Sequence, residues 1–189
     1  MAELIEIDTD RLRLRQWCSA DREPFATLNA NPRVMEFFPA LLSRAESDAI
    51  ADRCQSLIAE RGWGLWVVEL RNTGGFIGFV GLHTPAYLPF SPCVEVGWRL
   101  DAKYWGQGYA TEAARAAVRV GFEQLALTDI VSFTAVGNIR SRAVMEKLGM
   151  RNTGETFEHP NIPVGDALCE HCLYRLSREQ WQEMTHNRR

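Results

Sequence analysis

Residues 94–114 read VEVGWRLDAKYWGQGYATEAA, and this stretch decides the fold. Its first part, Val94 to Leu100, is apolar and β-prone, which predicts a strand. Two glycines, Gly106 and Gly108, follow, and a run suited to an amphipathic helix begins directly after them. The order strand, glycine turn, helix gathers free backbone amides and the positive end of a helix dipole at one point. This geometry binds anions, and a pyrophosphate group is its natural occupant.

The spacing of residues around the two glycines separates three alternatives to a specialised pyrophosphate loop. A Walker nucleotide site is excluded because no Gly-Lys-Ser/Thr stands at the helix start. The dinucleotide fingerprint is weak because Thr111 occupies the place of its third glycine or alanine, and the next strand does not end in a suitable acidic residue. A glycine turn that merely reverses the chain stays open on spacing alone.

Outward from this stretch, strands and helices are expected in an order typical of an α+β fold with a mostly antiparallel mixed sheet, flanking helices and a crossover helix near its middle. Before this stretch we expect a strand over Arg11 to Trp17, a helix begun by Asn31 and Pro32, and a helix from the capping box of Ser43 and Glu46 to about Arg61. A hairpin of Leu65 to Leu70 and Phe76 to Leu82 and a proline-rich loop over Thr84 to Pro92 lead into it, and a helix from about Gly108 to Leu125 follows its glycines. After that we expect a strand near Ile130 to Ala135, a helix capped by Asn138 and ended by Gly149, strands over Arg151 to Phe157 and Asp166 to Leu176, and a terminal helix capped by Ser177 and Gln180. No linker or repeat interrupts this order, so a single domain over residues 1–189 is predicted, with a motif core of about 10–176.

Composition restricts the class of protein. The net charge of -3 leaves no basic surplus for binding nucleic acid. The first ten residues, MAELIEIDTD, are acidic and lack the apolar run of a signal peptide, and no segment approaches the ~20 apolar residues that span a bilayer. We therefore expect a soluble, cytoplasmic protein with neither nucleic acid nor a membrane as partner.

The cysteines are odd in number and scattered, which favours reduced thiols over a disulfide framework. Cys169 and Cys172 form a C-x-x-C around His171, but no second ligand pair stands at zinc-site spacing. Buried strand cysteines are the favoured interpretation, and no metal is expected.

The residues Trp105-Gly106-Gln107-Gly108-Tyr109-Ala110 resemble the pattern Q/R-x-x-G-x-G/A of the GCN5-related N-acetyltransferase (GNAT) family, which cradles the pyrophosphate of acetyl-CoA. Trp105 departs from the pattern at its first position. With Glu-Val-Gly-Trp before it and Ala-Thr-Glu-Ala after it, the segment is similar to the ribosomal-protein N-terminal acetyltransferase-like (RimJ/RimL-type) branch.

A second segment carries the same resemblance. Asn138-Ile139-Arg140-Ser141 and Glu146-Lys147-Leu148-Gly149-Met150 are similar to the N-x-x-S and E-K-L-G-F segments of that branch, with Met150 in place of the usual aromatic. The two matches and the compatible element order cover most of the chain from Arg11 to Leu176.

The resemblance implies an acyltransferase that uses acetyl-CoA as co-substrate and an amine acceptor, with direct attack of the amine on the thioester in a ternary complex. Backbone amides around Trp98 to Leu100 would stabilise the carbonyl oxygen, and the same strand edge would pair with pantetheine. The cofactor-binding residues expected from it are Trp98, Leu100, Trp105, Gly106, Gln107, Gly108, Tyr109, Ala110, Thr111 and Asn138.

Glu95 is the candidate general base. It lies in an otherwise apolar strand, on the face opposite Val94 and Val96, where partial burial would raise its pKa toward working pH. A structural ion pair with Arg99 is the alternative role.

Ser141 is the candidate acid, because Met145 occupies the position of the tyrosine that many family members use. A role in holding the cofactor or the helix is equally open for Ser141. Asn138 is expected to cap its helix, contact pantetheine, or do both.

Other polar side chains are assigned no catalytic role. Surface charge is the default for Arg140, Arg142 and Lys147, which the 3′-phosphate would otherwise attract, and a structural role is the default for His83.

The acceptor side is expected from Val34 to Pro39, Trp63 and the Tyr87 to Phe90 loop, and the acceptor is either a protein N-terminus or a small amine. The non-enzymatic alternative is a catalytically silent acyl-CoA-binding regulatory module. A homodimer is left open.

Overall fold

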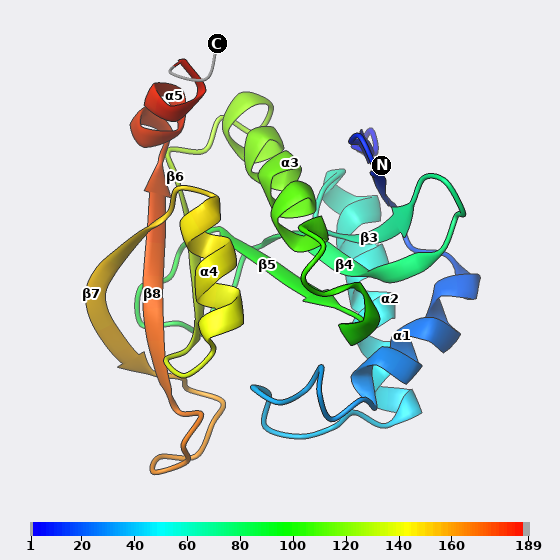
Figure 1. Ribbon diagram of the computed structural model, residues 1–189, viewed down its shortest axis with the longest axis horizontal. Coiled ribbons are helices and arrows are strands. Elements are labelled where there is room, and N and C mark those ends of the chain that lie inside the picture. The colour runs from blue at the N-terminus through cyan, green and yellow to red at the C-terminus, as the bar shows by residue number, and fades with distance from the viewer. Residues whose placement is uncertain (1, 187–189) are drawn as a thin grey trace.

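The computed structural model describes residues 2–186, so the first residue and the last three of the predicted domain lie outside the described residues (Figure 1). Its strands form one sheet in the order β1-β2-β3-β4-β5-β6-β8-β7. The strands are β1 (Ile7–Asp8), β2 (Leu12–Arg15), β3 (Leu65–Leu70), β4 (Phe76–His83), β5 (Glu95–Leu100), β6 (Asp129–Ala135), β7 (Arg151–Glu158) and β8 (Glu170–Ser177). The helices are α1 (Arg22–Asn29), α2 (Arg44–Arg61), α3 (Tyr109–Glu123), α4 (Ile139–Lys147) and α5 (Arg178–His186), with short 3-10 turns η1 (Ser19–Asp21) and η2 (Ala102–Tyr104).

The sheet is antiparallel except at its centre, where β5 and β6 run parallel. A parallel pair needs a long crossover, and η2 with α3 supplies it. The predicted α+β class, the mixed and mostly antiparallel sheet and the central crossover helix are confirmed.

The β5–β6 pairing is brief. Glu95 pairs with Val131, the Val131 amide donates to the Val94 carbonyl at 2.9 Å, and the Ser132 hydroxyl donates to the Val96 carbonyl at 2.9 Å. No pairing of β5 with β6 is found beyond Val96 in the described chain, so the two strands diverge toward the end of β5. The divergence leaves one edge of β5 open.

Helix α3 packs over β4 and β5 on one face of the sheet, and α1 and α2 cover the other face (Figure 1). Small side chains line the buried side of α3, and Ala113, Ala114 and Ala117 are completely buried. A β-carbon at Gly121 would lie 2.8 Å from Ile130 Cδ1, so this glycine lets the helix approach β6 closely. The close approach fixes where α3 begins relative to the open edge of β5.

Capping signals in the sequence were accurate at two helices. Ser43 and Glu46 form the predicted capping box of α2. Ser177 and Gln180 cap α5 in the same way, with the Gln180 amide donating to Ser177 Oγ at 3.2 Å. Both boxes satisfy amides that the first helical turn leaves free.

Two predicted elements were wrong. No helix begins at Asn31: its side chain accepts from the Arg33 amide, and residues 31–40 form turns and bends. The last long strand begins at Glu170 rather than Asp166, because the Asp166 side chain accepts from the Leu168 amide at 2.8 Å and folds residues 166–169 into a turn.

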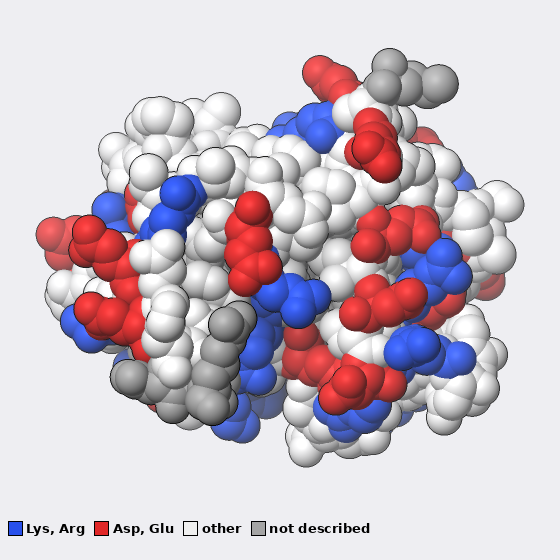
Figure 2. All heavy atoms as spheres, turned by 90° about the horizontal axis from the view of Figure 1, so that it is seen from above, with Lys and Arg blue, Asp and Glu red and all other residues white. Residues whose placement is uncertain are grey.

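Acidic and basic side chains are intermixed on the face seen in Figure 2. No helix among residues 2–186 is long and apolar enough to cross a membrane. Over the same residues, no group of three or more His, Cys, Asp or Glu side chains is arranged to hold a metal ion.

Candidate active site

The glycine loop has the conformation that an anion cradle needs. Gly106 and Gly108 have φ values of 76° and 82°, in the left-handed region that favours glycine. No atom lies within 4 Å of the position of a β-carbon at Gly106, so this side of the loop is open. The first helical hydrogen bond runs from the Glu112 amide to the Gly108 carbonyl at 3.0 Å, which leaves the amides of residues 109–111 free for a ligand.

Trp105 ties this loop to the sheet. Its indole N–H donates to the Leu100 carbonyl at 2.9 Å, at the end of β5. The departure from the family pattern at this position therefore has a structural consequence, since a tryptophan closes the corner between strand and loop. Gln107 turns back onto the loop and donates to the Lys103 carbonyl at 3.2 Å.

Arg11 holds the loop from the bend directly before β2, and the sequence analysis missed it. Its guanidinium donates to the Gln107 carbonyl at 2.9 Å, pairs with Glu112 at 2.6 Å and lies over the Tyr109 ring at 4.4 Å. Sequence offered no signal for these contacts, because Arg11 and Glu112 are 101 positions apart.

The open edge of β5 exposes backbone groups to the groove. The Val94 and Val96 carbonyls point toward β6. The Asp101 amide points the opposite way and donates to the Ile77 carbonyl of β4. Alternation along the strand then directs the backbone of Trp98 and Leu100 toward the gap where β6 has diverged. The Leu100 carbonyl accepts from the Trp105 indole, so the Trp98 groups and the Leu100 amide are the ones that face a ligand. An extended ligand can pair there as a short strand does.

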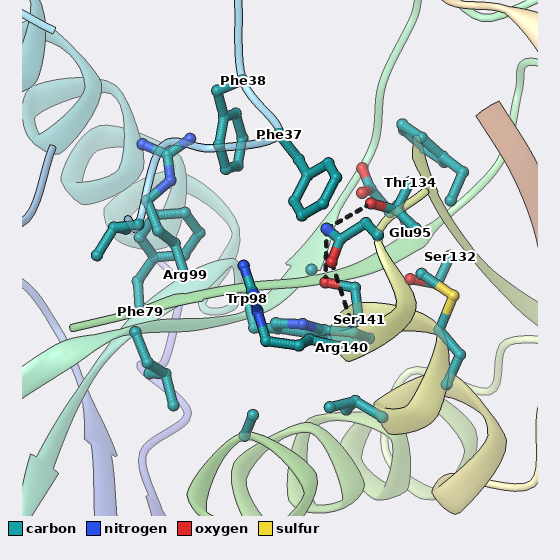
Figure 3. Close-up of a pocket in the computed structure, with 18 of the residues that line it drawn as sticks. Phe37, Phe38, Phe79, Glu95, Trp98, Arg99, Ser132, Thr134, Arg140 and Ser141 are labelled. Atoms are coloured by element: carbon teal, nitrogen blue, oxygen red, sulfur yellow. Dashed lines mark hydrogen bonds between the residues drawn. The ribbon is translucent and has the colours of Figure 1, made fainter. Parts of the chain in front are cut away.

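One pocket of about 690 Å³ joins the loop, the strand edge and the face under the α1–α2 connection (Figure 3). It is lined by every predicted cofactor and catalytic residue except Gln107, namely Glu95, Trp98, Leu100, Trp105, Gly106, Gly108, Tyr109, Ala110, Thr111, Asn138 and Ser141. The fold thus brings the two sequence segments at 95–111 and 138–141 to a single cavity.

Glu95 is the one acidic side chain among the described residues that line this pocket. Its Oε1 lies 3.5 Å from where a β-carbon would stand on Gly97, so the carboxyl group follows the strand on the pocket face. Burial raises the pKa of Glu95 to about 8, although part of the side chain is open to the pocket. No ion pair joins Glu95 to Arg99 within residues 2–186; Arg99 donates to Asn29 Oδ1 at 2.7 Å instead.

His83 is the cross-strand partner of Glu95 on β4 and also lines the pocket. Burial, with the charges of Arg61 and Arg53, lowers the pKa of His83 below its ordinary value. The imidazole is therefore uncharged at neutral pH, and it places no charge beside Glu95.

Asn138 caps α4 and holds Ser141. The Ser141 amide donates to Asn138 Oδ1 at 3.2 Å, while Asn138 Nδ2 donates to Thr134 Oγ1 at 2.9 Å and to Ser141 Oγ at 3.1 Å (Figure 3). Because Ser141 Oγ accepts from Asn138, its hydroxyl proton remains available to a group in the pocket. Met145, on the next turn of α4, is buried and lines the same pocket.

The predicted acceptor side is partly as expected. Val34, Phe37, Phe38, Pro39 and Tyr87 line the pocket. Trp63 packs against the core beneath Arg61, and Phe90 makes edge-to-face contacts with Phe133 and Phe157, so neither residue lines the pocket.

Sequence reasoning missed a second wall of the pocket, built from β6, β8 and the loop before β8. Its residues are Ser132, Phe133, Thr134, His159, Asn161, Ile162 and His171. The His159 and His171 rings lie 4.8 Å apart, and burial lowers the pKa of both side chains. The usable signal was alternation in the strand over Cys169-Glu170-His171-Cys172, which puts His171 on one face of β8.

The three basic residues considered for the 3′-phosphate separate in the structure. Arg140 lines the pocket, pairs with Glu36 at 2.5 Å and lies over the Trp105 ring at 4.6 Å. Arg142 donates to the Val136 carbonyl at 3.1 Å and to the Tyr174 hydroxyl at 3.3 Å, whereas Lys147 lines the pocket.

Comparisons with known proteins agree with this geometry. A family model of the acetyltransferase (GNAT) domain matches residues 11–151. The uncharacterized protein YkkB of Bacillus subtilis is 33% identical over 161 residues, covering 82% of this chain and 90% of that protein. FsC-acetyl coenzyme A-N(2)-transacetylase of Aspergillus fumigatus is 31% identical over 189 residues, covering 94% of this chain and 78% of that protein. A GNAT-family acetyltransferase structure from Bacillus anthracis has 26% identity and a TM-score of 0.77, covering 93% of this chain and 99% of that one.

Two further likenesses bear on the predicted branch and ligand. The putative ribosomal N-acetyltransferase YdaF of Bacillus subtilis is 28% identical, covering 58% of this chain and 57% of that protein, in agreement with the predicted branch. Spermidine N-acetyltransferase of Vibrio cholerae, solved in complex with CoA and spermine, shares the fold with a TM-score of 0.72 at 20% identity, covering 92% of this chain and 99% of that one.

A pyrophosphate loop at a helix start, beside two diverging parallel strands, suits a ligand that carries a pyrophosphate and an extended arm, as acetyl-CoA does. The family match extends over well more than half of the chain. The chain belongs to the GNAT acetyltransferase family, and it is an acetyl-CoA-dependent acyltransferase.

Proposed function

We propose that this enzyme transfers the acetyl group of acetyl-CoA to a primary amine by direct attack in a ternary complex, with Glu95 as the general base. The observation that carries the proposal is the position of Glu95, the one carboxyl group among the described pocket-lining residues, at the point where β5 and β6 begin to diverge. Acetyl-CoA supplies the thioester carbonyl that the amine attacks. The residues of the chain must then remove a proton, stabilise charge on the carbonyl oxygen and assist the departing sulfur.

The proton of the amine goes to Glu95, directly or through one water. Its pKa of about 8 makes its ionised form a stronger base than an ordinary glutamate, while leaving a useful ionised fraction near neutral pH. The uncharged imidazoles of His83, His159 and His171 favour the neutral, reactive form of an amine over its ammonium form.

The carbonyl oxygen is stabilised by the backbone amide of Trp98 on the open edge of β5. This amide is fixed in direction by the antiparallel pairing of Trp98 with Val80, so it needs no reorganisation as charge develops. The Ser141 hydroxyl, held through its oxygen by Asn138, donates a hydrogen bond to the departing thiolate. A thiolate is already a fair leaving group, so this contribution is smaller than that of Glu95.

The phosphates of CoA bind the free amides at the start of α3, with Gly106 leaving space for them. Pantetheine then pairs with the Trp98 and Leu100 edge and brings the thioester to Glu95. The acceptor enters under residues 34–39, on the face of β5 that carries Glu95.

Relatives support an amine acceptor without selecting one. Their names are a putative ribosomal N-acetyltransferase, a spermidine N-acetyltransferase and an FsC-acetyl coenzyme A-N(2)-transacetylase. We propose that the acceptor is a protein N-terminus or a small amine.

The proposal is tested by incubating the purified protein with isotopically labelled acetyl-CoA and a soluble cell extract, then searching peptides and metabolites by mass spectrometry. Enzyme-dependent label on one class of amine is expected. Tight binding of acetyl-CoA with no labelled amine would contradict catalysis and favour a silent acyl-CoA-binding module.

A further inference from the structure

The pocket contains a cation that the reaction described so far does not use. Arg99 lies four residues beyond Glu95 on β5 and lines the same pocket. Alternation puts both side chains on one face of the strand. Figure 3 shows Arg99 with Phe38 and Phe79 at one end of the pocket and Glu95 at the other.

Arg99 has no acidic partner among residues 2–186. Its one hydrogen bond is from Nη1 to the neutral Asn29 Oδ1, and its Nε is buried with no acceptor. Burial lowers the pKa of Arg99 to about 10, which leaves the guanidinium charged at neutral pH. A guanidinium has five donors, so most of its hydrogen-bonding capacity is unused.

A network of buried residues holds this cation in place. Asn29, at the end of α1, is completely buried, and its Nδ2 donates to the completely buried Ser47 Oγ of α2 at 2.9 Å. The guanidinium also lies over the Phe38 ring at 4.1 Å. A half-buried charge that lines a pocket without a counter-charge is costly unless a ligand compensates it.

We propose that Arg99 binds a carboxylate of the amine acceptor, so that the preferred acceptors are amines carrying a negative group on the side remote from the reacting nitrogen. This inference rests on the proposed function, because Glu95 defines where the nitrogen lies. Four residues of strand separate the α-carbons of Glu95 and Arg99 by about 13 Å, and the long side chains shorten the gap that an acceptor must bridge. The charge and fork geometry of a guanidinium match a carboxylate.

The test uses acceptors that differ only in charge. Members of the series from 4-aminobutanoate to 8-aminooctanoate are each compared with their primary amides, by calorimetry on the CoA-saturated protein and by acetylation rate. The wild-type protein is expected to bind the best-fitting carboxylate about 10- to 100-fold more tightly than its amide, as for a charge-assisted hydrogen bond.

Three variants locate the preference. Arg99→Met keeps much of the packing on Phe38 and is expected to abolish the preference for the carboxylate. Arg99→Lys keeps the charge and is expected to retain part of the preference. Asn29→Asp keeps the shape of the network but gives Arg99 an internal carboxylate, so it is expected to abolish the preference with Arg99 intact.

Several results would overturn the inference. Equal binding of carboxylate and amide by the wild type, or a preference that survives in both Arg99→Met and Asn29→Asp, excludes an anion site at Arg99. A tenfold loss of CoA affinity in Arg99→Met would instead assign the cation to a cofactor phosphate.

The inference and the proposed function fail in different ways. Acetylation of both members of every pair at equal rates would remove the anion site and leave the transferase. Arg99-dependent binding of the carboxylate without acetylation of any amine would contradict the transferase and leave the anion site.

Discussion

Glu95 pairs with Val131 at the point where the parallel strands β5 and β6 begin to diverge. The acidic side chain of the pocket is therefore built into the sheet at the inner end of the groove that the open edge of β5 creates. This relationship places a proton acceptor next to the end of any extended ligand paired with that edge, and the consequences can be measured.

Glu95 should make stability depend on pH. Its pKa is raised from 4.5 to about 8, so between these values the folded chain binds one proton more than the unfolded chain. The free energy of unfolding of the wild type should thus fall, relative to Glu95→Gln, as pH rises from about 4.5 to 8 and change no further above 8. Allowing for water in the pocket, we expect a difference of about 2–4 kcal/mol, measured by urea unfolding of both proteins across this range. A constant difference across the range would show that Glu95 titrates normally.

Replacing Gly108 by valine should weaken acetyl-CoA binding about tenfold or more, because valine strains the left-handed backbone of the loop and its β-carbon would contact Arg11 Nη2 at 3.5 Å. Gly154→Val is the control for backbone strain: Gly154 has a φ of 80°, like the 82° of Gly108, but a β-carbon at Gly154 would meet no atom within 4 Å. Both variants should lose stability from the left-handed backbone. Calorimetry should find a large loss of affinity in Gly108→Val alone, and an equal loss in both would speak against the loop.

Arg11→Met should raise the KM for acetyl-CoA several-fold with little change in kcat, since Arg11 holds the loop through Gln107 and Glu112 but lies away from Glu95. Arg13→Met removes a nearby arginine, on β2, that pairs with Glu6 at 2.8 Å. Steady-state kinetics should show no change in this control. A fall in kcat at unchanged KM for Arg11→Met would be inconsistent with a positioning role.

Asn138→Ala should cost about 1 kcal/mol of stability, the usual value of a lost helix cap, and should also lower kcat several-fold because Ser141 loses its partner. Ser177→Ala removes the cap of α5, which is no part of the pocket, and should cost similar stability at full activity. Thermal unfolding and rate measurements on both variants separate the two effects. Full activity of Asn138→Ala would exclude a catalytic use of the held Ser141.

Local signals predicted much of the fold. The capping boxes at Ser43 and Ser177 each depend on two residues three positions apart, so both partners can be identified from the local sequence. The same kind of signal failed at Asn31, because Val34, Phe37 and Phe38 line the pocket instead of forming the apolar side of a helix. A helix start without a supported continuation is a turn.

The site was predicted where it is contiguous and missed where the fold assembles it. The loop at 105–111 binds through its own backbone amides, so its glycines were enough to predict an anion-binding loop. The contacts of Arg11 and His159 depend on partners far away in the chain, and so does the lack of an acidic partner for Arg99. Alternation alone left open an ion pair between Glu95 and Arg99, which is not found in the described chain. Which charges remain without partners is a property of tertiary structure.

The most direct test of the account is the pH profile of kcat for the wild type and Glu95→Gln at saturating acetyl-CoA and amine, with acetyl-CoA affinity measured in parallel. The wild-type rate should rise with pH to about 8 and then level off, because the base must be ionised. Glu95→Gln should bind acetyl-CoA normally, turn over about 100-fold more slowly and lose that rise beyond what the amine itself contributes. A variant with the wild-type rate and profile would contradict the assignment of Glu95 as the base.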